Sequence, residues 1–496
     1  MIPRYSNPEI DYLWSDAEKL LRWERVELAV IKARVNLKLT DASVYNQIEL
    51  ALANNAPDVA WWLERDRVLH HDLNAFLEER QRFIPNELQS EFHKDMTSYD
   101  TEEAAFAIAL RESHEYVDNE LSALLESLEK MAKDYRYTIF LERTHGQAAK
   151  LRTFGGRLLT YVADLQLARD QLKVGVGYCM QSRLSGAIGN YGGGLTPRIE
   201  KEALNILGLS AYVGATQIMP RSIYAPLAQS LQVLCETLGK IALDIRLGAR
   251  SGQPLWHEPF GKLQKGSSAM PHKKNTIRTE QMRGMVLLAR GRVASIVAGI
   301  QTWEARAIEQ SCVERVDWPD LFHITLRMLN VMTEVLTKLV VYPDNMLEEI
   351  QASRCTYASD EAKNFLAGKL AERALPANEA YRIVQLASFC AFEPGPARQE
   401  LREARAESLE KADAFLTSFE LVPTVPTSTN LRDIISSGLL YPVDSLQASV
   451  DDIIPWNLLL KDLFKDESVM NEWNNLFRPS HLLQQETSIF NHFLDT

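Results

Sequence analysis

Apolar residues recur every three or four positions over long stretches of the chain. The clearest stretch contains the seam Leu227, Leu231, Leu234, Leu238, Ile241 and Ile245. Steps that alternate between four and three residues place these side chains on one face of an α-helix of about five turns. The pattern therefore predicts a long helix with one continuous buried face.

Two earlier segments repeat this pattern. Leu121, Leu125, Leu128 and Met131 form a second seam, and the stretch 158–174 is rich in apolar positions. Long helices with apolar seams on more than one side need neighbouring helices to cover them. We therefore expect an all-α fold whose central bundle of long helices continues between subunits.

The chain is expected to form three segments: residues 1–110, residues 111–358 with the long-helix bundle, and residues 359–496 with shorter helices. In the third segment, EPGPARQE and LVPTVPTSTN bring prolines and a Thr/Ser cluster, which indicate loops. The aromatic and amphipathic remainder is expected to fold. It could form a cap over this segment or a pair of partner-binding helices.

Composition narrows the class of protein. The chain has 496 residues, 46% hydrophobic and 24% charged, and can bury a large core. Its net charge of −12 and its lack of a basic run argue against a nucleic-acid-binding surface. Five scattered cysteines without CxxC spacing indicate reduced thiols, and neither a signal-peptide pattern nor an apolar run of about 20 residues is present. We expect a cytoplasmic protein that binds no membrane.

Candidate chemistry is concentrated in the segment GSSAMPHKKNTIRTE, residues 266–280, which reads as a mobile loop that presents hydroxyls, cations and an amide to an anion. A serine hydroxyl is a poor base, so Ser267 needs donors that stabilise its alkoxide and a closing lid that excludes water. Lys273 and Asn275 could stabilise the charge that spreads over a carboxylate when the adjacent carbon loses its proton. Taken alone, such a segment is more often a solvated basic turn.

The segment resembles the signature loop of the fumarase/aspartase superfamily, and within it that of the adenylosuccinate lyases. The resemblance extends over residues 1–390 through separate motifs in the family's order. These motifs are Arg4-Tyr5, His71-Asp72, the segment with His93, Thr97, Ser98 and Asp100, His145 in RTHG, the glycine-rich turn from Ser185 to Gly193, Thr216-Gln217, and Arg306, Ser311 and Arg315.

The resemblance implies a three-domain fold with a tetrameric helical core, in which motifs from three subunits build each active site. It implies that Ser267 is the general base, that Lys273 and Asn275 stabilise the aci-carboxylate, and that His145 protonates the leaving nitrogen, with His71 also in the catalytic set. The candidate substrate-binding residues, of which the last three would hold the nucleotide phosphate, are Arg4, Tyr5, Asp72, His93, Thr97, Ser98, Gln217, Ser268, Glu280, Arg306, Ser311 and Arg315.

The implied reaction is β-elimination of fumarate from adenylosuccinate, giving AMP, and from the succinylcarboxamide imidazole ribotide, giving its carboxamide, in purine biosynthesis. No metal, flavin or nicotinamide cofactor is expected, because the leaving nitrogen belongs to a stabilised heteroaromatic or carboxamide system. The doublet His70-His71 could suggest a metal ligand, but no second group with zinc-like spacing accompanies it.

Some positions depart from the family's usual pattern. Thr276 replaces a proline, Asp95 a glycine, Ser222 and Ala307 aspartates, and Glu304-Ala305 a His-Glu pair. These changes leave two alternatives open. One is a superfamily lyase or cycloisomerase that acts on a different succinylated or carboxymuconate substrate, and the other is a catalytically inactive assembly protein.

Overall fold

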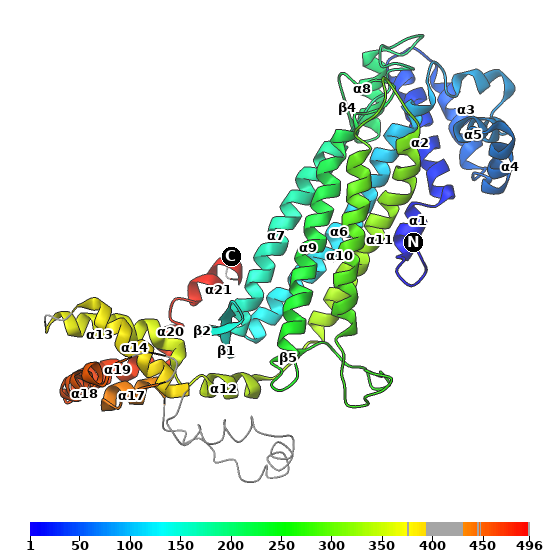
Figure 1. Cartoon of the computed structure of the whole chain (residues 1–496). Coiled ribbons are helices and arrows are strands. Elements are labelled where there is room, and N and C mark those ends of the chain that lie inside the picture. The colour runs from blue at the N-terminus through cyan, green and yellow to red at the C-terminus, as the bar shows by residue number, and fades with distance from the viewer. Residues whose placement is uncertain (374–375, 393–429, 444–445, 447, 495–496) are drawn as a thin grey trace. The chain divides into compact units, whose positions relative to one another are not determined.

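The structure is a computed structural model that describes residues 1–373, 376–392, 430–443, 446 and 448–494 (Figure 1). Most of the stretch expected to form proline-rich loops, 393–429, lies outside these residues. The described chain is mostly helical, which confirms the all-α prediction. It divides into two compact units: unit 1 contains residues 1–128, 161–249 and 257–340, and unit 2 contains residues 129–160, 250–256 and 341–496.

The division into three consecutive segments remains a prediction. The two compact units do not test it, because each unit combines several separate stretches of the chain. One helix, α6 (Ser98–Asp134), runs through the boundary expected near residue 110. Another, α13 (Ser359–Ala371), begins where the third segment was expected to begin.

Unit 1 is built mainly from helices, with very short strand pairs between them. β3 (Gln181–Ser182) pairs with β4 (Ser210–Ala211). The pair of β5 (Trp256–His257) and β6 (Val340–Val341) is divided between the units, since Trp256 and Val341 belong to unit 2. The elements are α1 (Pro8–Leu13), α2 (Asp16–Asn36), α3 (Ala42–Ala53), α4 (Val59–Leu69), α5 (Asp72–Gln81), the 3₁₀ helix η1 (Asn86–Glu91), α6, α7 (Phe154–Cys179), β3 (Gln181–Ser182), α8 (Pro197–Ile206), β4 (Ser210–Ala211), the 3₁₀ helix η2 (Arg221–Ile223), α9 (Ala225–Gly248), β5 (Trp256–His257), α10 (Ile277–Ala298), α11 (Glu309–Thr337) and β6 (Val340–Val341).

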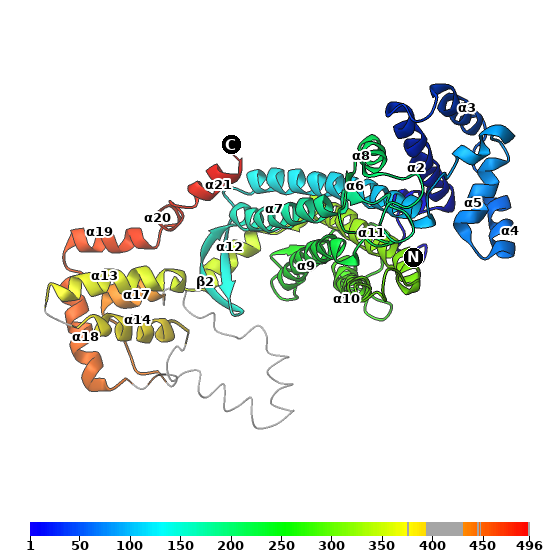
Figure 2. The ribbon, with the colours of Figure 1, turned by 90° about the horizontal axis from the view of Figure 1, so that it is seen from above.

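The long helices α6, α7, α9, α10 and α11 run alongside one another as a bundle (Figures 1 and 2). The predicted seam of α9 is confirmed, because none of its six side chains is more than 2% exposed. Gly239 in α9 allows α10 to approach closely: a Cβ added there would lie 2.6 Å from a methyl group of Val286. The bundle is therefore held together by the periodic apolar faces that the sequence displays.

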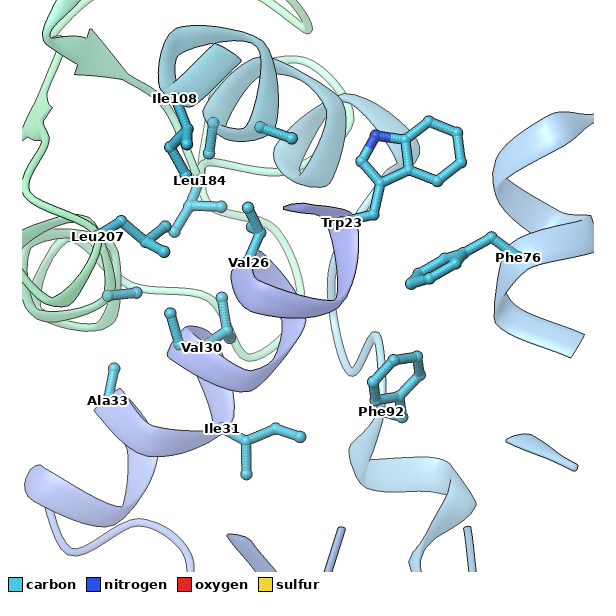
Figure 3. Packing of buried hydrophobic residues seen from close by; sticks show 14 of the residues in the cluster. Trp23, Val26, Val30, Ile31, Ala33, Phe76, Phe92, Ile108, Leu184 and Leu207 are labelled. Carbon is cyan, nitrogen blue, oxygen red and sulfur yellow. The ribbon is translucent and has the colours of Figure 1, made fainter. Parts of the chain in front are cut away.

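A second core lies around α2 and is shown in Figure 3. Ser15 caps the start of α2, and its hydroxyl accepts a hydrogen bond from the backbone N–H of Glu18 at 3.3 Å, an S-x-x-E arrangement typical of helix starts. Trp23 meets Phe76 edge to face with ring centroids 5.4 Å apart. Leu184 and Leu195, which flank the glycine-rich turn, belong to this core together with residues of α2 and α6, and Figure 3 shows Leu184 beside Ile108.

Unit 2 combines a β-hairpin with short helices. Its elements are β1 (Ile139–Thr144), β2 (Gln147–Thr153), α12 (Pro343–Ala352), the 3₁₀ helix η3 (Thr356–Ala358), α13, α14 (Ala377–Phe392), α17 (Leu431–Ser437), α18 (Val450–Leu463), α19 (Glu467–Leu476), α20 (Pro479–Leu482) and α21 (Thr487–Leu494). Trp473 of α19 is fully buried beside Phe365 of α13, with ring centroids 5.6 Å apart. The aromatic and amphipathic remainder of the chain, here called the carboxy-terminal extension (described residues 430–443, 446 and 448–494), therefore completes the core of this unit.

Candidate active site

The serine loop, residues 259–275, leads from β5 to α10. Next to it, the carboxylate of Glu258 is 1% exposed and accepts hydrogen bonds from the backbone N–H groups of Arg278 (3.2 Å) and Thr279 (3.1 Å) in the first turn of α10. His257 Nε2 lies 3.1 Å from a backbone carbonyl of the loop. A carboxylate at a helix N-terminus satisfies otherwise unpaired N–H groups and complements the helix dipole. Both ends of the loop are thus attached to the start of α10.

Ser267 lies half-exposed within this loop. Its Oγ accepts hydrogen bonds from the backbone N–H groups of Met270 (3.0 Å) and Ala269 (3.3 Å). Two N–H donors aimed at one oxygen stabilise negative charge on it, as in an oxyanion hole. The loop conformation therefore supplies the alkoxide stabilisation that a basic serine requires.

The ends of the loop segment meet at Gly266. A Cβ added at this residue would lie 2.0 Å from the carbonyl oxygen of Lys273, so only glycine fits here. The amide of Asn275 donates a hydrogen bond to the carbonyl of Gly266 at 2.7 Å. Asn275 therefore closes the loop with one N–H and retains a second for an incoming ligand, while the Lys273 side chain is exposed.

His145 lies at the tip of the hairpin formed by β1 and β2 in unit 2. Thr144 pairs with Gln147, so that His145 and Gly146 form a two-residue turn, and their φ angles are 54° and 76°. Positive φ at both central residues is required by a type I′ turn. The imidazole of His145 is therefore presented, exposed, at a tight hairpin turn.

A cleft of about 780 Å³ in unit 1 brings together the three predicted phosphate-binding residues, Arg306, Ser311 and Arg315. His71 and Asp72 come from the start of α5, and Ser311 and Arg315 come from the first two turns of α11. The lining residues are Asp66, Arg67, His70, His71, Asp72, Tyr99, Glu102, Arg306, Ala307, Ile308, Ser311 and Arg315. Segments more than 200 residues apart in the sequence thus converge on one concave surface.

Two of the three arginines that line the cleft, Arg306 and Arg315, were predicted to bind phosphate, and both already have partners. Arg315 donates a hydrogen bond to the Asp72 carboxylate at 2.6 Å, and the Arg315 guanidinium remains 55% exposed. Arg306 donates to Oε1 of Gln217 at 2.9 Å and stacks over the ring of Tyr99, 4.1 Å from its centroid. A guanidinium carries five N–H donors, so both arginines can bind an anion in addition to these partners.

His93 and Asp100 do not line the cleft but bond to neighbouring elements of unit 1. His93 Nδ1 lies 2.8 Å from Glu27, and although burial lowers the pKa of His93, the Glu27 carboxylate outweighs this and raises the pKa overall. Asp100 is fully buried, pairs with Arg183 at 2.8 Å and accepts a hydrogen bond from the backbone N–H of Ser185 at 2.9 Å. His93 thus connects the segment before α6 to α2, and Asp100 connects α6 to the glycine-rich turn.

Tyr99 and Glu102 are among the cleft residues that were not predicted from the sequence. Burial raises the pKa of Tyr99 to about 12, and burial together with the Asp72 carboxylate raises the pKa of Glu102 to about 8. Helical spacing could have indicated Glu102 from the sequence. It follows Ser98 by four residues and therefore lies on the same face of α6.

The remaining candidates lie elsewhere. Arg4 and Tyr5 lie in the turn before α1, and neither lines the cleft. Ser268 is exposed in the serine loop, and Glu280 is exposed on the first turn of α10, 3.7 Å from Arg246. Thr97 and Ser98 stand at the start of α6, where the backbone N–H of Thr97 donates to Asp100. Throughout the described ranges, no three His, Cys, Asp or Glu side chains are grouped as a metal site would require.

The Asp95 departure has a structural explanation. Asp95 has a φ of 63°, in the left-handed region that aspartate tolerates better than most residues, and its carboxylate pairs with Arg34 at 2.8 Å. A Cβ added at Gly194 would lie 2.1 Å from Asp95 Oδ2, so the glycine-rich turn leaves room for this side chain. The added charge is therefore neutralised beside the site.

Comparisons with known proteins agree with these features. Residues 18–291 match the family model described as Lyase. The chain is 33% identical to the adenylosuccinate lyase of Synechocystis sp. over 84% of this chain and 93% of that protein. It is 31% identical to the adenylosuccinate lyase of Aquifex aeolicus over 79% of this chain and 89% of that protein.

Solved structures share the fold. The fumarate lyase from Mesorhizobium sp. BNC1 superposes with a TM-score of 0.77 at 18% identity, covering 99% of this chain and 98% of that one. The β-carboxy-cis,cis-muconate cycloisomerase from Acinetobacter calcoaceticus gives a TM-score of 0.73 at 16% identity, with coverages of 99% and 98%. In the part of the chain that the structure describes, every helix is too short or too polar to cross a bilayer.

Proposed function

The chain belongs to the adenylosuccinate lyase family, within the fumarase/aspartase superfamily, and we propose that it releases fumarate from adenylosuccinate to give AMP. The same elimination on the succinylcarboxamide imidazole ribotide gives the corresponding carboxamide in purine biosynthesis. The observation that carries the proposal is the pair of N–H groups on Ser267 Oγ, in a loop that also holds Lys273. This arrangement suits proton removal from a carbon beside a carboxylate.

Each step of the elimination has a residue of suitable chemistry. Ser267 Oγ takes the proton from the succinyl carbon, and the electron pair left behind moves onto the adjacent carboxylate. The ammonium of Lys273 and the second N–H of Asn275 stabilise that charge. The electron pair then forms the double bond of fumarate as the carbon–nitrogen bond breaks, and His145 gives its proton to the departing nitrogen.

The cleft of unit 1 would bind the nucleotide. Arg306, Ser311 and Arg315 offer guanidinium and hydroxyl donors to the phosphate, and Gln217 is held beside them through Arg306. His71 lies at the same cleft, where its exposed ring can contact the reacting end of the substrate.

We further propose a cytoplasmic homotetramer with shared active sites. Exposed apolar side chains on the bundle support subunit contacts: Leu167 and Val174 on α7 are each 61% exposed, and Leu287 on α10 is 63% exposed. Apolar seams of this kind are covered when long helices assemble into larger bundles.

The test is ultraviolet absorbance with adenylosuccinate, with fumarate measured by a separate assay. Wild-type protein should give AMP and fumarate in equal amounts, and Ser267→Ala should lower kcat by about 10²- to 10⁴-fold, because the base is lost. Ser127→Ala, at an exposed hydroxyl of α6, is the matched control and should retain activity. Equal rates for Ser267→Ala and wild type would contradict the proposal.

A further inference from the structure

One carboxyl group of the cleft has no role in the elimination described above. Glu102 lines the main cleft and also a smaller adjoining cavity of about 220 Å³, and both cavities share Tyr99, Glu102, Ser311 and Arg315. Ser311 and Arg315 are the residues assigned to the phosphate. Glu102 therefore lies where the negatively charged end of a nucleotide would bind.

Glu102 also lacks a partner of its own. Within the described residues, no hydrogen bond or ion pair joins its carboxyl to another side chain, whereas Arg315 is bonded to Asp72 and Arg306 to Gln217. Side chains in a partly buried cleft usually satisfy their polar atoms, so an unpaired carboxyl facing the cavity suits contact with a ligand.

The surroundings of Glu102 are charged but locally paired. The groups that face it across the two cavities are Asp66 and Arg67 on α4, His70, His71 and Asp72 at the start of α5, Tyr99 and Glu103 on α6, Arg306 before α11, Glu314 and Arg315 on α11, Asp16, Lys19 and Arg22 on α2, and Arg221 in η2. Arg221 pairs with Glu103 and Glu314, Arg22 with Glu112, and Lys19 with Asp16. Arg67 pairs with Glu64. The charges that act on Glu102 itself are those of Asp72, Arg315, Arg306 and Glu103.

The protonation state of Glu102 changes the charge that an anion would meet beside Arg306 and Arg315. With Glu102 neutral, its carboxyl group adds no negative charge there. With Glu102 ionised, a carboxylate would lie beside a phosphate dianion. Because burial and Asp72 raise the pKa of Glu102 to about 8, the neutral form dominates at neutral pH. A neutral carboxyl also has an O–H to donate.

We propose that Glu102 is a substrate-binding residue whose neutral carboxyl group donates a hydrogen bond to the phosphate of the nucleotide. The inference rests on the proposed function, since it requires a nucleotide phosphate in this cleft. We therefore expect the affinity for substrate to fall as the solution becomes alkaline. Ionisation of Glu102 removes the hydrogen-bond donor and places there a carboxylate that repels the phosphate.

The experiment is the KM for adenylosuccinate as a function of pH. If only the neutral form binds, KM of the wild type should rise about tenfold between pH 7 and pH 9, in proportion to the loss of the competent form. The substrate phosphate does not contribute to this change in KM, because its second pKa is about 6 and it is already mainly a dianion at pH 7. Glu102→Gln retains a neutral donor at every pH, so its KM should stay flat and close to the wild-type value at pH 7. Glu115→Gln, at an exposed carboxylate on the same helix, should follow the wild type.

Each outcome is decisive. A flat wild-type KM, or a Glu102→Gln variant whose KM rises as in the wild type, overturns this inference while leaving the lyase activity established. A wild-type protein that neither cleaves adenylosuccinate nor binds AMP overturns the proposed function and this inference with it. The wild-type profile decides the matter even if the variant folds poorly, which circular dichroism would reveal.

Discussion

At the scale of single residues, His93 shows how a histidine paired with a carboxylate is held. It has a φ of 60°, its ring bonds to Glu27, and Glu27 also accepts a hydrogen bond from Thr101 at 2.6 Å. The pKa of His93 is raised overall, so folding favours its protonated form. A group with a raised folded-state pKa stabilises the protein fully below its unfolded pKa, and this contribution is lost as pH rises through the folded value.

This sign gives a stability prediction for His93→Asn. Asparagine tolerates positive φ, so the substitution removes the ion pair with little backbone strain. The melting temperature should fall below that of the wild type by more at about pH 6 than in alkaline solution above the raised folded-state pKa of His93, where the imidazole has lost its charge. Thermal unfolding followed by circular dichroism measures this, with His272→Asn in the exposed serine loop as control. Equal decreases in melting temperature at both pH values would show that His93 and Glu27 do not form a charged pair.

At the scale of elements, the start of α10 determines where the serine loop lies. Glu258 accepts hydrogen bonds from the backbone of Arg278 and from both the backbone and the hydroxyl of Thr279. Thr276, which stands where the family usually has proline, is 8% exposed and makes no side-chain cap. The cap that this helix start needs is therefore supplied by Glu258, from the other end of the loop.

Replacing Glu258 by alanine should be costly. Two buried N–H groups would lose their acceptor, which should lower the free energy of unfolding by about 2–4 kcal/mol. The loop would also lose its attachment, so kcat should fall even though Glu258 touches no substrate. Denaturant unfolding and steady-state assays measure the two effects, and Glu126→Ala, at an exposed position of α6, is the control. A stable variant with wild-type kcat would show that the loop is held by other contacts.

At the scale of the whole molecule, the proposed catalytic groups are divided between the two units. Ser267 and the cleft belong to unit 1, and His145 belongs to unit 2. The carboxy-terminal extension supports the hairpin of His145: both carboxylate oxygens of Glu486 accept from the backbone N–H of Thr153 in β2, at 3.2 and 3.0 Å. Of the two roles left open for this extension, its buried packing within unit 2 favours the cap.

Shared active sites predict complementation between inactive variants. If Ser267 and His145 of one site come from different subunits, mixing Ser267→Ala with His145→Ala and allowing subunits to exchange should restore about a quarter of wild-type activity, since some sites then receive both intact residues. Light scattering should show a tetramer in each sample. Mixtures that stay inactive although exchange has occurred would mean that both residues come from one chain.

The sequence by itself determined the helices and the reaction class. The seam of α9 and the segment GSSAMPHKKN could be interpreted from the order of residues alone, because helical periodicity and a loop motif are local properties of the chain. The family resemblance added the candidate residues of the cleft, and Asp72, Arg306, Ser311 and Arg315 do line one surface.

Only the tertiary structure decided how these residues are paired. Arg315 and Asp72 are separated by 243 positions, and no local pattern indicates that they bond. The two N–H donors on Ser267 depend on the closed path of the loop, and the tight turn at His145 depends on the pairing of β1 with β2. Glu102 differs from an ordinary surface glutamate only through burial beside Asp72. Charge, protonation and hydrogen bonding depend on neighbours that packing brings together, and the order of residues does not specify those neighbours.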